Sequence, residues 1–192
     1  MIVFTIEQLA IAHIRQCCKH LEESKSNKVR LLYAASTAHL ALHTVLMISA
    51  YSESDTSVLD KRSRKRVEAD PHIVHEGVRV KVFSLLLEDF LAEDGKNHSD
   101  LKAKMRAVRE TITDLSSIRN QLEHPVPGVN GFTQRLIVDS IEIVALLIAD
   151  FLSELSLDNA SIKNCADDSK ETIEAIVRLC RSIRKDIGPE VI

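Results

Sequence analysis

Residues 101–125 have the sequence LKAKMRAVRETITDLSSIRNQLEHP. Apolar residues recur there at steps of three and four, which is the spacing of one helix face: Leu101, Met105, Val108, Ile112, Leu115, Ile118 and Leu122. The pattern predicts a long helix that is capped by Ser99 or Asp100 and ends near His124. It ends there because the residue before a proline, here Pro125, disfavours the helical conformation.

A second, polar stripe on this helix leads to its C-terminal end: Lys102, Arg106, Arg109, Thr113, Ser116 and Asn120. Arg119 and His124 follow in the last turns, and these residue types can bind phosphate and transfer protons near neutral pH. Positions five apart lie roughly 140° apart on a helix, so only Asn120 and His124 share a face. The alternative is a capping role, in which Arg119 and His124 complement the helix dipole.

Composition predicts the fold class. The chain has 192 residues, of which 45% are hydrophobic, with only 5 Gly and 4 Pro, so helix formers dominate and turn residues are few. We expect an all-α protein: a single domain, residues 1–192, built as an antiparallel bundle of about five or six helices. The predicted helices are about 5–23 with Thr5 as N-cap, 29–51, 78–92, 99–124, 132–155 and 169–187.

Two segments between these helices are predicted to be loops. Residues 52–78 contain a basic run and are predicted to form a long basic loop with room for a short helix. Residues 156–168 are polar and loop-like, so residues 156–192 are expected to form a C-terminal helical extension.

Residues 31–51 contain no Asp, Glu, Lys or Arg and are long enough to span a bilayer. They also contain His39, His43 and several hydroxyl side chains, which favours a central buried helix, and no membrane partner is expected. A signal peptide is not indicated, because no basic residue precedes the N-terminal apolar residues and Glu7 follows them closely.

The cysteines predict a reducing compartment. They are Cys17, Cys18, Cys165 and Cys180, and no CxxC pair occurs. We expect reduced thiols and a cytoplasmic protein.

The net charge of −3 excludes a protein that binds polyanions by bulk charge, so nucleic-acid contacts would need local basic patches. The run from 61 to 66 and the helical stripe supply the predicted RNA-binding residues: Lys61, Arg62, Arg64, Lys65, Arg66, Lys102, Arg106 and Arg109. The alternative for the run is a solvated loop. No aromatic residue interleaves it, so base stacking is not indicated.

Metal-like spacings occur at His39 and His43, at His13 and Cys17, and at His72 and His75 with Glu76. Each offers a pair of ligands without the third and fourth, so we expect no metal and no cofactor, and a metal-binding bundle is the weakest hypothesis. The sequence has no Gly-rich phosphate loop and neither a GxSxG nor an HExxH motif.

The stretch Arg119-Asn120-Gln121-Leu122-Glu123-His124 resembles the Rx4–6H motif of the HEPN superfamily. In that family the residue after the arginine is often polar, and Asn120 fits. The resemblance implies a bundle of about four or five helices, which residues 5–155 would supply.

The resemblance also implies an activity. Many HEPN proteins are metal-independent endoribonucleases in which the RNA 2′-hydroxyl attacks the adjacent phosphodiester in a composite dimer site. His124 would be the general base or acid, Arg119 would stabilise phosphoryl charge, and Asn120 would orient His124 or a phosphate oxygen. Nearby arginines would favour neutral His124.

The partners implied are RNA and a second copy of the chain, with a toxin or defence role and a protein antitoxin or regulator as a further partner. A non-catalytic HEPN-like module that binds RNA, nucleotide or a protein is the alternative. Some HEPN toxins paired with nucleotidyltransferases carry a modified tyrosine two positions after the histidine. Val126 stands there in this chain, so control through that tyrosine is not expected.

Overall fold

The computed structural model describes residues 5–53, 57–69, 79–92, 98–123, 131–157 and 159–188. Within these ranges the chain forms eight helices and no strand, so the protein is all-α, as predicted. The helices are α1 (Ile6–Glu23), α2 (Arg30–Glu53), α3 (Lys61–Ala69), α4 (Phe83–Ala92), α5 (Ser99–Ala107), α6 (Arg109–Glu123), α7 (Gln134–Leu155) and α8 (Ala160–Ile187).

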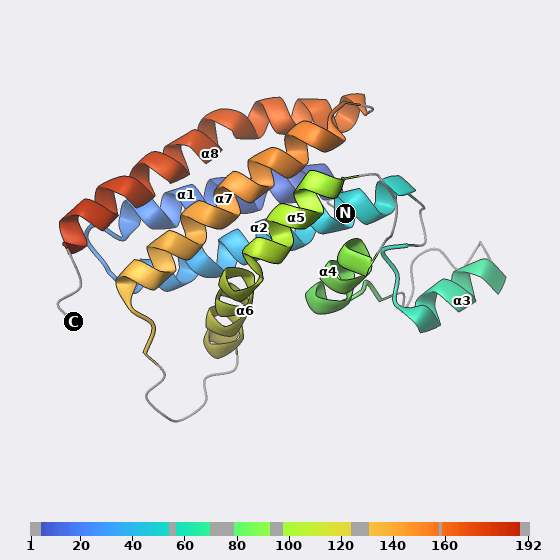
Figure 1. Ribbon diagram of the computed structural model, residues 1–192, viewed down its shortest axis with the longest axis horizontal. Coiled ribbons are helices and arrows are strands. Elements are labelled where there is room, and N and C mark those ends of the chain that lie inside the picture. The colour runs from blue at the N-terminus through green and yellow to red at the C-terminus, as the bar shows by residue number, and fades with distance from the viewer. Residues whose placement is uncertain are drawn as a thin grey trace, which may run out of the picture.

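Two antiparallel hairpins form the body of the molecule (Figure 1). One hairpin is α1 with α2 and the other is α7 with α8; α1 packs beside α8, and α2 packs beside α7. Their inward side chains join one hydrophobic cluster, to which α4, α5 and α6 also contribute. The helix α8 therefore closes the core of the bundle.

The most apolar helix, α2, lies at the centre and packs against α1, α4, α6 and α7. Ala34, Ala35, Ala38 and Ala41 are all buried, and their small side chains let neighbouring helices approach closely. Among the described residues, Arg30–Tyr51 is the one helix apolar and long enough to cross a membrane, yet 61% of its most apolar window is buried inside the molecule. Core helices of globular proteins meet the same criterion.

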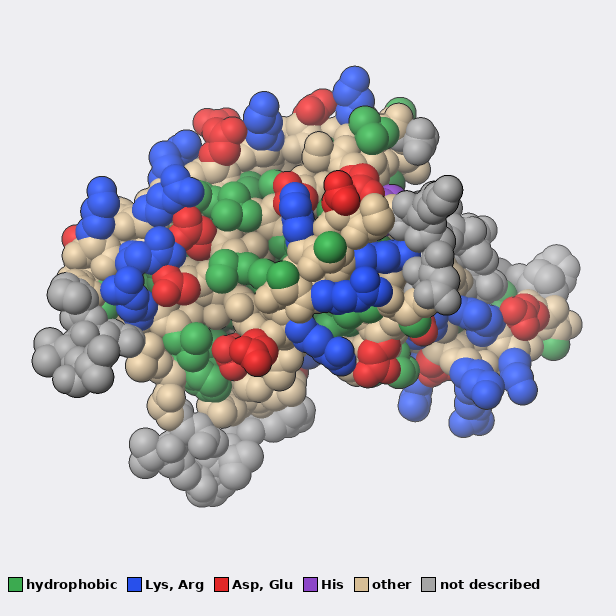
Figure 2. All heavy atoms as spheres, viewed as in Figure 1, with side chains coloured by type: hydrophobic (Ala, Val, Ile, Leu, Met, Phe, Trp, Pro, Cys, Tyr) green, Lys and Arg blue, Asp and Glu red, His purple; other side chains and the backbone are tan. Residues whose placement is uncertain are grey.

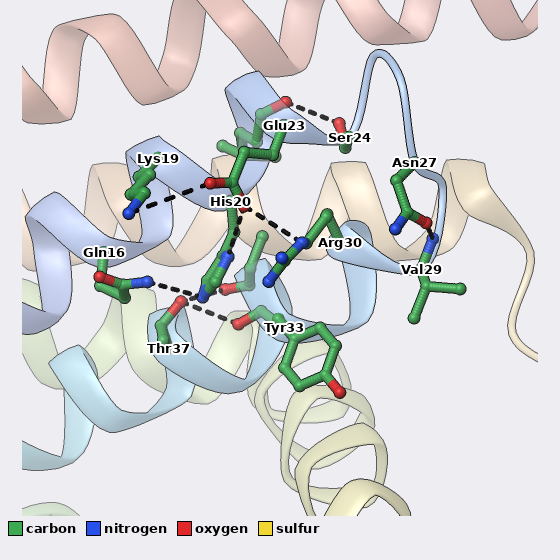
Figure 3. A network of polar contacts seen from close by, with 12 residues as sticks. Gln16, Lys19, His20, Glu23, Ser24, Asn27, Val29, Arg30, Tyr33 and Thr37 are labelled. Carbon is green, nitrogen blue, oxygen red and sulfur yellow. Dashed lines mark hydrogen bonds and ion pairs between the residues drawn. The ribbon is translucent and has the colours of Figure 1, made fainter.

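A polar network joins the ends of α1 and α2 (Figure 3). The amide of Gln16 donates to Nε2 of His20 over 2.9 Å, which leaves the other ring nitrogen 3.5 Å from Glu23. The same carboxylate pairs with Arg30 at 3.1 Å, and the Arg30 guanidinium lies 5.7 Å from the Tyr33 ring centroid. This network holds the short turn that makes the hairpin.

The start of α1 agrees with the prediction, because Thr5 is its N-cap and forms a capping box with Gln8. The start of α8 was predicted wrongly. Most of the predicted loop 156–168 is helical, because Asn159 caps α8 by accepting from two backbone N–H groups. Ile162 and Cys165 then extend the buried face towards the N-terminus of α8.

The predicted helix 99–124 is divided in two. Val108 departs from helical dihedrals, with φ −107° and ψ 18°, and it separates α5 from α6. The axis changes direction there (Figure 1), so that α5 packs against α4 and α7 while α6 packs against α2 and α7. The predicted apolar face is buried at Leu101, Met105, Ile112, Leu115 and Ile118.

The basic run lies on α3, a short helix for which the prediction of a long loop at 52–78 left room. The carboxylate of Asp60 accepts the backbone N–H of Ser63 at 2.7 Å, which caps the helix. An isolated antiparallel bridge pairs Leu59 with Val80, and it takes up residues that were predicted to begin the next helix. That helix, α4, begins at Phe83 instead of residue 78.

Candidate functional site

Arg119 and Asn120 lie on the last turns of α6. Ile118 faces the core, Arg119 borders it with 28% of its side chain exposed, and Asn120 is fully on the surface. The described part of the motif therefore presents a half-buried cation beside an exposed amide.

The guanidinium of Arg119 is held by Glu123, one turn further along α6. Nη2 of Arg119 lies 2.8 Å from Oε2 of Glu123, and Nε donates to Oε1 over 3.1 Å. These parallel contacts are the bidentate geometry with which an arginine also binds a phosphate. A phosphate bound by this face of Arg119 would therefore compete with the Glu123 carboxylate.

His124, Pro125 and Val126 lie outside the described residues, as do all residues from 124 to 130. Of the predicted catalytic residues, the structure places Arg119 and Asn120. The side chain of Asn120 is exposed to solvent.

Two histidines of α2 lie close to the same site. His39 and His43 are one turn apart, and both rings contact Phe83, with ring centroids 4.3 Å and 5.7 Å away. The positive charge of Arg119 acts on both imidazoles. The sequence showed this pair only as a metal-like spacing; its proximity to Arg119 is a property of how α6 packs on α2.

Burial, together with the charges of Arg119 and His43, lowers the pKa of His39 to about 3. Burial also lowers the pKa of His43. A hydrogen bond to the backbone of Lys81 raises this pKa in part, and the charge of Arg119 lowers it. Both histidines are therefore neutral near pH 7.

The buried imidazoles have unused hydrogen-bonding capacity. Neither ring nitrogen of His39 has a hydrogen-bond partner in the described part of the chain, and the same is true of Nε2 of His43. His39 is 2% exposed, so water in bulk does not satisfy its nitrogens. Orphaned polar groups of this kind each disfavour folding by about 1–3 kcal/mol.

The predicted RNA-binding residues of the basic run are on the surface of α3. Lys61, Arg62, Lys65 and Arg66 are exposed, whereas Arg64 is half-buried and turns towards the bundle, donating to the Ser57 carbonyl over 3.2 Å. Lys and Arg side chains gather over this end of the molecule (Figure 2).

The predicted basic stripe of Lys102, Arg106 and Arg109 lies only partly on the surface. Lys102 is 3% exposed and its ammonium lies 5.5 Å from the Phe90 ring centroid, so its prediction as an RNA contact is wrong. Its aliphatic stem fits the apolar face because α5 turns that side towards α4. Arg106 and Arg109 are exposed on either side of the break at Val108, and Arg106 donates to the Leu91 carbonyl over 2.8 Å.

The metal-like pairs do not converge in the described ranges, where no group of three or more His, Cys, Asp and Glu side chains could hold an ion. His72, His75 and Glu76 lie outside those ranges. The four cysteines are free thiols. Burial raises the pKa of all four thiols, to about 11 for Cys165 and to about 12 for Cys180. A raised pKa disfavours the thiolate, which is the form that binds metals.

Comparisons of the chain with protein-family models, with curated proteins and with solved structures find no match.

Proposed function

We propose that the chain is a metal-independent endoribonuclease of HEPN type. The observation that supports this most is the spacing Arg119-Asn120-x3-His124 at the end of a helix in an all-α bundle. Arg119 borders the surface, where a phosphate can reach it. The pairing of its guanidinium with a carboxylate is compatible with anion binding.

The proposed reaction is intramolecular transfer within RNA. His124 takes the proton of the 2′-hydroxyl, or protonates the 5′-oxygen that leaves. Arg119 stabilises the negative charge that develops on the phosphoryl oxygens, and Asn120 orients His124 or one of those oxygens. The products are a 2′,3′-cyclic phosphate and a 5′-hydroxyl end.

Incubation of purified protein with RNA in the presence of a chelator tests the mechanism. Cleavage is expected to persist, and Arg119→Ala and His124→Ala should each reduce it at least about 100-fold. Arg178→Ala is the charge-matched control, because Arg178 is exposed on α8 with only an i, i+4 partner. Cleavage that needs a metal, or that survives both substitutions, rules this mechanism out.

We propose a homodimer in which two copies of the motif form one cleft. A mixture of Arg119→Ala and His124→Ala subunits should then regain part of the lost cleavage, because a mixed dimer holds one intact Arg119 and one intact His124. Native mass spectrometry, which resolves the small mass difference between the two variants, reports whether mixed dimers form. Mixed dimers without any recovered cleavage would contradict a shared site.

The biological setting proposed is cytoplasmic, as a toxin or a defence effector that a protein antitoxin or regulator restrains. Support comes from the four free thiols, which suit a reducing compartment. Co-purification from cells under native conditions tests for the restraining protein.

A second candidate is a non-catalytic module that binds RNA, nucleotide or a protein. The exposed cations of α3 favour RNA among these, because they lie on a helix that makes few contacts with the bundle. Replacing Lys61, Arg62, Lys65 and Arg66 by Gln should weaken RNA binding and flatten its dependence on salt. Binding without cleavage of any RNA would select this candidate over the first.

A further inference from the structure

A hollow of about 390 Å³ lies between the C-terminal part of α2, the start of α3 and helix α4. Its floor is apolar, with Leu46, Ala50, Leu86 and Phe90. Its volume falls within the range of small-ligand sites, about 300–1,000 Å³. We call it the α2–α3–α4 hollow.

Two cations line this hollow from different segments. Arg64 comes from α3, and Lys81 comes from the residues just before α4. The Lys81 side chain is only 14% exposed, and its ammonium lies 2.7 Å from Asp89, whose own side chain is 59% exposed. The described lining therefore holds two cations and one carboxylate, and the carboxylate lies beside Lys81.

The position of Arg64 relative to Lys81 is fixed by backbone contacts. The bridge between Leu59 and Val80 is flanked by hydrogen bonds from Asp60 N–H to the Arg79 carbonyl and from Lys81 N–H to the Val58 carbonyl, both 2.9 Å. The hydroxyl of Ser63 also accepts the Arg79 N–H over 2.8 Å. The two backbone segments that carry the cations are therefore held together before any ligand arrives.

The hollow is linked to the candidate site through His43. The charge of Arg119 acts on His43, which also hydrogen-bonds the backbone of Lys81, a residue that lines the hollow. Along α2, the sequence His39, His43, Leu46, Ala50 then runs from the Arg119 end to the hollow. At a rise of about 1.5 Å per residue this path is about 16 Å long.

We propose that the α2–α3–α4 hollow is a subsite for one nucleotide of an RNA strand, with Arg64 and Lys81 binding its phosphate. The inference rests on the proposed function, because Arg119 is taken to bind the scissile phosphate of the same strand. The sugar and base lie over the apolar floor. The exposed cations of α3 then attract the strand, whereas Arg64 and Lys81 position it.

The test uses fluorescence anisotropy with a short 2′-O-methyl RNA, which binds but lacks the attacking hydroxyl. Arg64→Gln and Lys81→Gln should each weaken binding about tenfold. Arg178→Gln is the matched control on the exposed face of α8, and it should weaken binding less than about twofold. Asp89→Asn should tighten binding, because it removes the carboxylate that competes with the phosphate for Lys81. Loss of a merely structural contact would not have that effect.

Equal weakening by Arg64→Gln and Arg178→Gln would overturn the subsite in favour of bulk surface charge, and so would weaker RNA binding by the Asp89→Asn variant. Binding of adenosine 5′-monophosphate without binding of the RNA would overturn it as an RNA subsite. If the protein binds the RNA in preference to adenosine 5′-monophosphate but cleaves no RNA, the proposed catalysis is contradicted and the proposed subsite still stands. If all the variants cleave and bind RNA as the unmodified protein does, the proposed subsite alone is contradicted.

Discussion

At the scale of single residues, Arg119 shows how one side chain is shared between structure and proposed function. Its guanidinium is occupied by Glu123, inside the motif itself. An i, i+4 ion pair stabilises a helix by only about 0.3–0.5 kcal/mol. A phosphate can therefore displace the carboxylate with only a small loss of free energy. Glu123 is thus expected to moderate the affinity of Arg119 for anions.

The first prediction concerns that carboxylate. Glu123→Gln should tighten RNA binding about twofold to fivefold, because it frees the guanidinium and removes a negative charge beside the phosphate. Glu110→Gln, at the other end of α6, is the matched control and should have no comparable effect. Anisotropy titrations measure both, and equal or weaker binding by Glu123→Gln would contradict the expectation.

The second prediction concerns His39. Its pKa is near 3 in the folded protein and 6.5 as an ordinary imidazole, so the unfolded chain binds a proton that the folded chain rejects between these values. Stability should therefore fall as the pH falls below about 6.5, by up to about 1.4 kcal/mol per pH unit from this group. His39→Phe should remove that part of the slope and change stability by less than about 1 kcal/mol at pH 7.

Urea denaturation of the two proteins between pH 7 and pH 4 measures this difference. Other titrating groups are common to both proteins, so the difference in free energy of unfolding isolates His39. The expectation fails if the two pH profiles are parallel.

At the scale of elements, one buried carboxylate on α7 links that helix to two arginines of α8. Glu142 is 7% exposed and accepts from Arg181 over 2.8 Å and from Arg184, which also reaches Asp139 at 2.6 Å. Burial alone would raise the pKa of Glu142, but the hydrogen bonds from the two arginines outweigh it and hold the pKa below its usual range.

The third prediction follows from that ion network. Arg184→Met should destabilise the protein by about 2 kcal/mol, because it leaves part of a buried carboxylate unpaired. Arg178→Met on the same helix should change stability by less than about 0.5 kcal/mol, since its pair with Glu174 is 3.8 Å long and exposed. Thermal and urea unfolding compare the variants, and equal losses would contradict the structural role given to Glu142.

The divided helix is the element that sequence periodicity described least well. The apolar ladder from Leu101 to Ile118 is continuous, and nothing in its spacing signals that the helix breaks at Val108. The break lets α5 pack against α4 and α6 pack against α2, while both helices contact α7. The same rotation buries Lys102 and separates it from the exposed stripe.

At the scale of the whole molecule, the thiols report on whether the bundle is closed. Cys17, Cys165 and Cys180 are buried at the contacts among α1, α7 and α8, and Cys18 is half-buried. All four have raised pKa values, mainly through burial. A closed bundle protects such thiols both by access and by suppressing the thiolate.

The fourth prediction is a thiol count. In the native protein near pH 8, at most one thiol, that of Cys18, should react with a disulfide reagent, and it should react slowly. The substitution Cys18→Ser should abolish that reaction. Unfolding in guanidinium should expose every thiol present. Rapid reaction of two or more thiols in the native state would show that α8 detaches readily from α1 and α7.

The sequence by itself determined the all-α class, the N-cap at Thr5 and most inward faces, because these depend on local spacing and on the chemistry of neighbouring residues. It also supplied the motif around Arg119, whose pairing with His124 stays a prediction. Its error at Ala160 arose because a polar sequence was interpreted as a loop where a single capping side chain, Asn159, starts a helix. Asp60 starts α3 in the same way, inside a segment predicted as a loop with room for a short helix.

The tertiary structure alone decided which distant residues meet. His39 and His43 lie under the influence of Arg119 because α6 packs across α2, and that packing follows from the whole core. Arg64 and Lys81 line one hollow because an isolated bridge fixes α3 beside the start of α4. Spacing along a chain sets the faces of each helix, whereas the total burial of apolar surface decides which faces touch.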